Sequence, residues 1–106
     1  MNKLLKSILI SSLLLILGST ITSADVMKGQ KLFTKKLKKD CNMTGARMAS
    51  KHSQDEWEVI NDSGALEKEI KKICPKIKNI KEKYLPHYYD FFYEYANDSG
   101  NIPSCS

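Results

Sequence analysis

Three cysteines and two histidines are the residues of this 106-residue chain whose types could do chemistry: Cys41, Cys74, Cys105, His52 and His87. Thiols form disulfides or act as thiolates, and imidazole can hold a metal ion. The chain has no Cys-x-x-Cys and no His-x-x-x-His pair, so the spacing predicts no metal site. It also has no nucleophile elbow, phosphate loop or recognisable pair of catalytic carboxylates. We therefore expect that the protein is not an enzyme.

The cysteine count allows one disulfide and one leftover thiol, and any two of Cys41, Cys74 and Cys105 are candidates for the bond. The loops that the three pairings would close differ about twofold in length, which changes the stabilisation by roughly 0.6 kcal/mol. Loop entropy therefore leaves the pairing open. A second interpretation also stays open: a thiol that is reactive or bonds another molecule, such as Cys41 activated by a neighbouring His52.

Residues 1–24 have the pattern of a secretory signal peptide. Lys3 and Lys6 precede an apolar core that is too short to span a bilayer, and Thr22-Ser23-Ala24 forms a small-residue cleavage site. We expect export to the periplasm, with no stable membrane anchor after cleavage; the alternative is an uncleaved anchor. Residues 25–106, which number 106 − 24 = 82, would form a single domain. A domain of this size often needs a cross-link or a cofactor for stability.

The mature chain would carry a mild positive charge. Removing Lys3 and Lys6 from the 17 basic residues leaves 15 against 12 acidic ones, a net charge of +3. Domains that bind nucleic acid concentrate more basic charge on one face. We therefore expect no nucleic-acid partner.

Apolar residues recur every three or four positions along most of the mature chain, which predicts helices. The first should run from Val26 to Lys38 or Lys39, with a lysine-rich outer face. Ser53 and Glu56 fit a capping box that begins a later helix. The other expected elements are a short helix or turn at 44–51, a helix through 57–60, one from 66 to Pro75, and a final helical stripe from 80 to 95 that closes at 97–100. No strand pattern appears, so the sequence predicts an all-α domain of four to five helices.

The final helix is unusually aromatic, because seven of the nine aromatic residues of the chain lie between positions 84 and 95. One side of a helix cannot bury all of them. We expect one set to pack inward and a second set to lie on another face, available to a partner or a flat ligand. The inward set is Tyr88, Phe91, Phe92 and Tyr95, and the outer set is Tyr89 and Tyr93.

Residues 29–33, Gly-Gln-Lys-Leu-Phe, together with this aromatic helix, resemble class I cytochrome c. In that family a glycine of the first helix meets an aromatic residue of the last, and Gly29 with Phe33 against 88–95 looks like that arrangement. The stretches 41–46, 51–57, 73–75 and 98–105 are also similar to a group of small periplasmic proteins described as cytochrome c-like without a haem-attachment signature. The resemblance implies a cytochrome c-like bundle over residues 25–106, with its N- and C-terminal helices packed together.

The chain departs from the family at its defining motif. Where cytochromes c have Cys-x-x-Cys-His, this sequence has Cys41-Asn42-Met43-Thr44-Gly45, so haem cannot be attached at two points. We therefore expect no cofactor. The alternative that the resemblance implies is haem held with His52 as an axial ligand, either without a covalent bond or through a single thioether to Cys41.

These observations favour an exported cytochrome c-like module without covalent haem, which acts as an accessory or partner-binding protein near periplasmic electron transfer. We expect a periplasmic protein partner. The alternatives are a haem-binding electron carrier with non-standard attachment, and a disulfide-stapled, non-redox binding protein that uses Tyr89, Tyr93 and the lysine-rich first helix.

One short motif concerns modification rather than binding. Asp40-x-Asn42-x-Thr44 resembles the acidic acceptor site of bacterial N-linked glycosylation, whereas Asn61-Asp62-Ser63 and Asn97-Asp98-Ser99 fit only the shorter Asn-x-Ser pattern. The sequence predicts Asn42 as the acceptor, although motifs of this length also arise by chance.

Overall fold

The computed structural model describes residues 23–103, and this range consists of helices, turns and loops. It confirms the predicted all-α class. The expected signal peptide lies outside the described residues except for its last two positions, and Cys105 also lies outside them. Within the described range, none of the helices has the length and apolar character needed to cross a membrane.

The first helical segment runs without a break from Ser23 to Cys41. It consists of α2 (Ser23–Leu32), one π-helical stretch, η1 (Phe33–Leu37), and α3 (Lys38–Cys41). The predicted end at Lys38 or Lys39 was two or three residues early. Asn42 ends the segment in the left-handed conformation, with φ of 52°, and donates its amide hydrogen to the Lys38 carbonyl at 2.9 Å.

Two side-chain caps start the next two helices. The Thr44 hydroxyl accepts a hydrogen bond from the Arg47 amide at 3.2 Å and begins α4 (Gly45–Ala49). Ser53 begins α5 (Gln54–Asp62), where its hydroxyl accepts from the Glu56 amide at 3.2 Å and the Glu56 carboxylate accepts from the Ser53 amide at 2.8 Å. The predicted capping box is therefore confirmed, because both of its hydrogen bonds form.

The second half of the domain contains α6 (Leu66–Ile73), the short 3-10 helix η2 (Glu82–Tyr84) and α7 (Leu85–Glu94). A non-helical stretch, residues 74–81, separates α6 from η2 and still buries Ile77 and Ile80. The predicted helical stripe from Ile80 was therefore wrong at its start. It was also wrong at its end, because α7 stops at Glu94 and not at 97–100.

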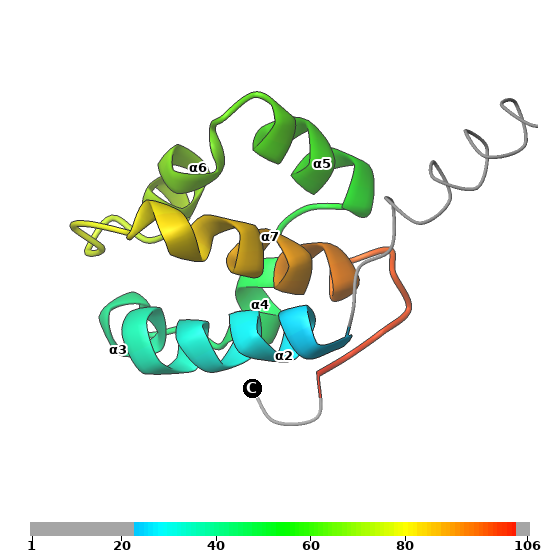
Figure 1. The fold of residues 1–106 in the computed structure, drawn as a ribbon, viewed down its shortest axis with the longest axis horizontal. Coiled ribbons are helices and arrows are strands. Elements are labelled where there is room, and N and C mark those ends of the chain that lie inside the picture. The colour runs from blue at the N-terminus through cyan, green and yellow to red at the C-terminus, as the bar shows by residue number, and fades with distance from the viewer. Residues whose placement is uncertain (1–22, 104–106) are drawn as a thin grey trace, which may run out of the picture.

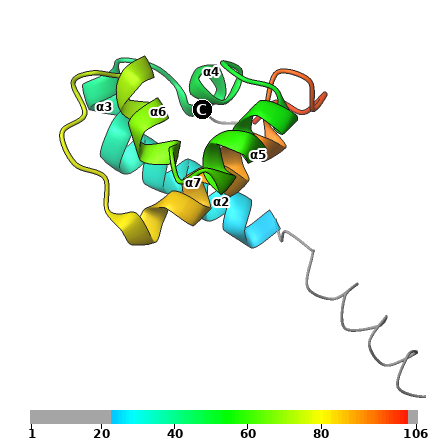
Figure 2. The same ribbon diagram turned by 90° about the horizontal axis from the view of Figure 1, so that it is seen from above.

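Helix α7 lies at the centre of the domain. It packs against α2 on one side and against α5 and α6 on the other, and α4 contacts it from behind α2 and α7 (Figure 1). The view from above shows the same arrangement (Figure 2). The expected packing of the first helix on the last is therefore present. Tyr88, Phe91 and Phe92 are fully buried as predicted, whereas Tyr95 is only half-buried, with its ring 5.5 Å from that of Phe91.

Two glycines allow the close approach of the helices to α7. A Cβ atom on Gly29 would overlap the His87 carbonyl oxygen and would lie 2.8 Å from its carbon and 2.9 Å from Phe91 Cβ. A Cβ atom on Gly45 would lie 2.6 Å from the Phe91 ring. Real side chains do not pack so closely, and backbone cannot yield as a flexible side chain can. The contact of Gly29 with Phe91 on the last helix is of the kind that the cytochrome c resemblance implies.

A disulfide joins Cys41 to Cys74, with Cα atoms 5.3 Å apart and 33 positions of sequence separation. Of the three pairings that the sequence left open, this is the one present. It ties the end of the first helical segment to the residue that follows α6. A loop of this length gives a cross-link a large effect on the entropy of the unfolded chain.

Candidate functional site

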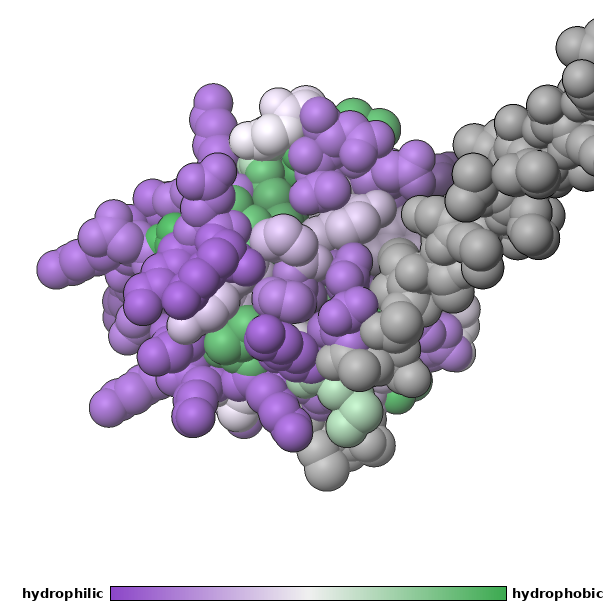
Figure 3. All heavy atoms as spheres, viewed as in Figure 1, coloured by the Kyte–Doolittle hydropathy of each residue, from purple (hydrophilic) through white to green (hydrophobic). Residues whose placement is uncertain are grey.

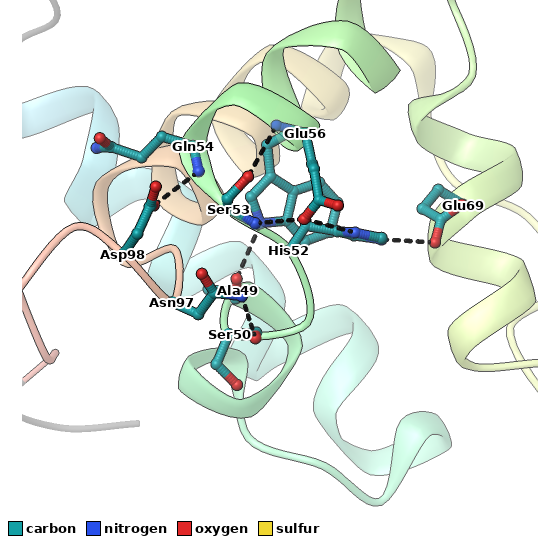
Figure 4. Close-up of polar contacts among 10 residues, drawn as sticks. Ala49, Ser50, His52, Ser53, Gln54, Glu56, Glu69, Asn97 and Asp98 are labelled. Atoms are coloured by element: carbon teal, nitrogen blue, oxygen red, sulfur yellow. Dashed lines mark hydrogen bonds and ion pairs between the residues drawn. The ribbon is translucent and has the colours of Figure 1, made fainter.

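His52 lies in the turn between α4 and α5, and neighbouring side chains hold its ring on three sides (Figure 4). Its Nε2 atom is 2.8 Å from Glu69 Oε2, on α6, and its Nδ1 atom is 3.6 Å from Glu56 Oε1. The rings of His52 and Trp57 form a T-shaped pair, with centroids 4.8 Å apart. The histidine is thus positioned by two carboxylates and one aromatic ring, and its side chain remains 24% exposed.

Trp57 fixes this arrangement from the interior. The tryptophan is fully buried, its indole nitrogen donates to the Ala49 carbonyl at 2.8 Å, and its ring stacks on Phe92 at 4.7 Å. A buried indole N–H needs a partner, and the Ala49 carbonyl supplies it. The ring contacts from Phe92 to Trp57 and from Trp57 to His52 therefore connect the core to the surface.

The segment after α7 adds a second set of bonds to the same turn. The Asn97 amide hydrogen is donated to the His52 carbonyl at 3.1 Å, and the Asn97 side chain donates to the Ser50 carbonyl at 3.3 Å. Asp98 accepts a hydrogen bond from the Gln54 amide at 2.9 Å (Figure 4). The turn is therefore held by the segment after α7 as well as by Glu69 of α6.

An open groove of about 430 Å³ lies beside the histidine. We call it the His52 groove, and it is lined by His52, Asp55, Glu56, Val59, Ile60 and Glu69. Its apolar part comes from Val59 and Ile60, and Val59 is 67% exposed. The face of the molecule in Figure 3 is largely hydrophilic, with small, separate apolar patches. Single exposed apolar residues are common, so the combination of Val59 with a hollow is the informative feature.

The rim of the His52 groove is acidic. Asp55, Glu56 and Glu69 contribute three carboxylates, and no lysine or arginine lines the groove. The hydrogen bond from the Ser53 amide, assisted by the nearby His52, lowers the pKa of Glu56. That carboxylate therefore stays ionised at neutral pH. A cation on an apolar stem would find both kinds of partner here.

The outer tyrosines were predicted to face away from the core, and they form a separate surface. Tyr89 and Tyr93 are half-buried, with ring centroids 5.8 Å apart. Burial is the main reason that the pKa of Tyr89 rises to about 12, and the charges of Glu58 and Asp62 add to it. Carboxylates of α5 are thus among the charges near Tyr89, and a contact face formed by Tyr89, Tyr93 and the lysine-rich first helix stays a prediction.

The residues that the cytochrome c resemblance assigns to haem do not fit that group in this structure. The Cys41 sulfur is bonded to Cys74, and a disulfide sulfur cannot also form a thioether. His52 directs its ring nitrogens at carboxylates, and Trp57 stacked on Phe92 fills the space beneath it. Haem binding through Cys41 or His52 stays a prediction, and it would require these contacts to break.

Two buried polar atoms have no hydrogen-bond partner among the described residues: the Tyr88 hydroxyl and His87 Nδ1. Burial, followed by the neighbouring Tyr84, raises the pKa of Tyr88 to about 12. Neither atom belongs to the His52 groove. Sequence reasoning did place Tyr88 inward, but an unpaired hydroxyl cannot be read from a helical stripe.

The part of the chain that the structure describes contains no group of three or more histidine, cysteine or acidic side chains arranged to hold a metal ion. We also compared the chain with protein-family models, curated proteins and solved structures, and none of them matches it.

Of the predicted site residues, the structure brings His52 into a groove and places Cys41 in a disulfide. Sequence reasoning missed Glu69 and Val59. Glu69 lies 17 positions from His52, so no local spacing signals the pair. Val59 could have been found, because it is two residues from Trp57, and such positions lie on nearly opposite sides of a helix.

Proposed function

We propose that this chain is an exported, cytochrome c-like module that works without covalent haem and binds a protein partner through the His52 groove. The observation that carries the proposal is an apolar hollow with exposed Val59, rimmed by three carboxylates, in a chain whose overall charge is positive. Charge complementarity selects the occupant: a segment of the partner that bears lysine or arginine beside an apolar residue.

The site is suited to such a segment for physical reasons. The turn that carries His52 is held by Glu69, Trp57 and Asn97, so its conformation is largely set before binding. A preorganised surface loses less entropy on association. The apolar stem of a lysine or arginine can lie on Val59 while its charged end meets the rim. The cytochrome c resemblance alone suggests that the partner works in periplasmic electron transfer.

The groove is tested with a synthetic amphipathic peptide of lysine and leucine as the probe. A peptide of glutamate and leucine of equal length is the control. Binding is followed by chemical-shift changes in the protein. We expect changes at the groove with the lysine peptide only. Val59→Ser removes apolar burial of about 1.5 kcal/mol and should weaken binding about tenfold. Asp55→Asn should weaken it by a smaller factor.

Matched controls exist elsewhere in the chain. Met27 is 55% exposed on α2, and Glu82 is an exposed acidic residue of η2. Met27→Ser also replaces an exposed apolar side chain by serine, and Glu82→Gln also neutralises an exposed carboxylate, both away from the groove. Equal affinity in the groove variants and in these controls would contradict the proposed surface. Shifts centred on Tyr89 and Tyr93 would move the contact face to the outer tyrosines.

A separate measurement tests haem independence. The mature protein is purified from an exporting, haem-sufficient host, and its visible spectrum is recorded. We expect no Soret band. A band that survives extraction with acidic acetone would establish covalent haem and the electron-carrier alternative. A band that is lost on extraction would indicate haem held without a covalent bond, and would also overturn haem independence.

A further inference from the structure

The turn between α3 and α4 contains the first of three Asn-x-Ser/Thr sequences, and its asparagine differs structurally from the other two. Asn42 is exposed, adopts the left-handed conformation and ends the first helical segment. Asn61 lies within α5, and the hydroxyl two residues later, that of Ser63, donates to the Ile60 carbonyl at 3.0 Å. The Asn97 side chain is bonded to the Ser50 carbonyl.

Sugar transfer to an asparagine requires that its side-chain amide reach an enzyme together with the hydroxyl two residues further on. An asparagine inside a helix, or one that ties two segments together, would have to leave those contacts first. Asn42 lies in an exposed turn. The Thr44 hydroxyl accepts from the Arg47 amide, and a hydroxyl in that role still has its own hydrogen to donate.

A hollow of about 480 Å³ lies directly beside this asparagine. Five of its six lining residues have polar or charged side chains, and the full lining is Thr34, Lys38, Lys39, Asn42, Met43 and Thr44. The Lys39 ammonium group can donate hydrogen bonds to the oxygens of a sugar, whereas the Thr34 hydroxyl already donates to the Gln30 carbonyl at 3.0 Å. The Met43 side chain offers an apolar surface to a sugar ring. The surroundings of Asn42 therefore provide room for a first sugar as well as access to the amide.

We propose that Asn42 is the N-linked glycosylation site of this protein, and that the first sugar lies in the hollow beside it. The donor would be an oligosaccharide attached through pyrophosphate to a membrane lipid. The Asn42 side-chain nitrogen forms a bond to the anomeric carbon, the bond from that carbon to the pyrophosphate oxygen breaks, and the amide loses one proton. The lipid pyrophosphate is the leaving group. This inference requires export but does not depend on the His52 groove.

The experiment is intact-mass analysis of the mature protein purified from its native source, followed by peptide mapping. We expect one added oligosaccharide mass, carried by the peptide that contains Asn42. Asn42→Gln should lose this mass completely, and Asn61→Gln and Asn97→Gln should keep it. Thr44→Ser retains a hydroxyl and should keep the mass, whereas Thr44→Val should lose it. Circular dichroism of each variant checks that the helices remain.

Two results would overturn the proposal. One is a native mass equal to that of the unmodified polypeptide. The other is an added mass that persists in Asn42→Gln and maps to Asn61 or Asn97, which would mean that exposure and turn conformation do not select the acceptor. The seating of the sugar in the hollow is tested with Lys39→Ala. The NMR resonances of the sugar are recorded in the folded, glycosylated variant and compared with those of the wild-type protein. Unchanged sugar resonances would contradict the seating of the sugar there.

Discussion

The first helical segment, residues 23–41, and helix α5 both pack on α7, yet their outer surfaces are opposite in charge. The first segment carries six lysines and two aspartates, whereas α5 has four acidic residues and no basic one. Large fully buried side chains anchor both, Phe33 in the first and Trp57 in α5. The difference lies in the exposed side: α5 contributes a strongly exposed valine and four residues of an acidic groove.

This contrast explains why we assign binding to α5. A lysine-covered helix face is an ordinary solvated surface, since each long side chain keeps its charge in water. An exposed apolar residue beside a hollow gains free energy only when something covers it. The sequence already shows the lysines, but the groove exists only after α6 brings Glu69 next to α5.

Trp57→Ala should have the largest effect, because it removes the anchor of α5. The substitution leaves a cavity against Phe92 and an unpaired Ala49 carbonyl, so we expect a loss of about 3–5 kcal/mol in unfolding free energy. Urea denaturation measures it. Val59→Ala, on the exposed side of the same helix, is the control and should change stability by less than about 0.5 kcal/mol. A small effect of Trp57→Ala would mean that α5 is not anchored through this ring.

Breaking the Cys41–Cys74 disulfide tests the anchor of the first segment. The double substitution to serine should cost about 2–5 kcal/mol, because the cross-link closes a loop across 33 positions. Denaturation of wild type and variant, both without reductant, measures the difference. Cys105→Ser is the matched control and should leave stability unchanged. If Cys105→Ser is the damaging substitution instead, the pairing described here is wrong.

Gly29→Ala should destabilise the contact between the first segment and α7. The added methyl group meets the backbone of His87, which cannot rotate away, so the helices must separate. Overpacking of this kind costs about 1–3 kcal/mol, although alanine favours the helix more than glycine does. Lys28→Ala, on the exposed side, is the control for helix propensity. A gain in stability for Gly29→Ala, measured by thermal or urea unfolding, would contradict the close crossing.

The contrast between these residues also shows how far the sequence can predict this molecule. The capping box at Ser53 was predictable because it depends on local spacing, and the Gly29 crossing was expected because the cytochrome c resemblance implies it. The π-helical stretch at Phe33–Leu37 was not predicted, because the three- and four-residue spacing of apolar residues indicates a helix without distinguishing a π-helical turn within it. The Cys41–Cys74 pairing was not either, since the possible loops are nearly equal in entropy.

Two glutamates of α6 each pair with a basic side chain: Glu69 with His52, and Glu67 with Lys71. Both have a closest distance of 2.8 Å, but the side chains of the first are 24% and 18% exposed and those of the second 36% and 37%. Glu69→Gln should therefore cost about 1 kcal/mol, whereas Glu67→Gln should cost about 0.3–0.5 kcal/mol. Urea denaturation of the two variants measures both. Equal losses of unfolding free energy in the two variants would mean that the His52–Glu69 pair stabilises the protein no more than an exposed surface ion pair does.

Tyr88→Phe should have the smallest effect at neutral pH and the opposite sign, because it removes a buried hydroxyl that has no partner among the described residues. We expect a gain of up to about 1 kcal/mol. The larger signature lies in alkali. The pKa of Tyr88 is about 12 in the folded protein and near 10.0 in an exposed tyrosine, so between these values the unfolded chain binds fewer protons than the folded one. Stability is then complete below pH 10 and falls as the pH rises toward 12.

Denaturation of wild type and Tyr88→Phe at pH 8 and pH 11 separates this effect from general alkaline unfolding. The variant should lose less stability between the two pH values, while Tyr89, whose pKa is also about 12, continues to contribute its share in both proteins. Tyr95→Phe is the matched control, since that tyrosine is only half-buried. An identical alkaline loss in wild type and Tyr88→Phe would mean that the Tyr88 hydroxyl reaches water or a partner, and that the interior around this side chain is less closed than its burial indicates.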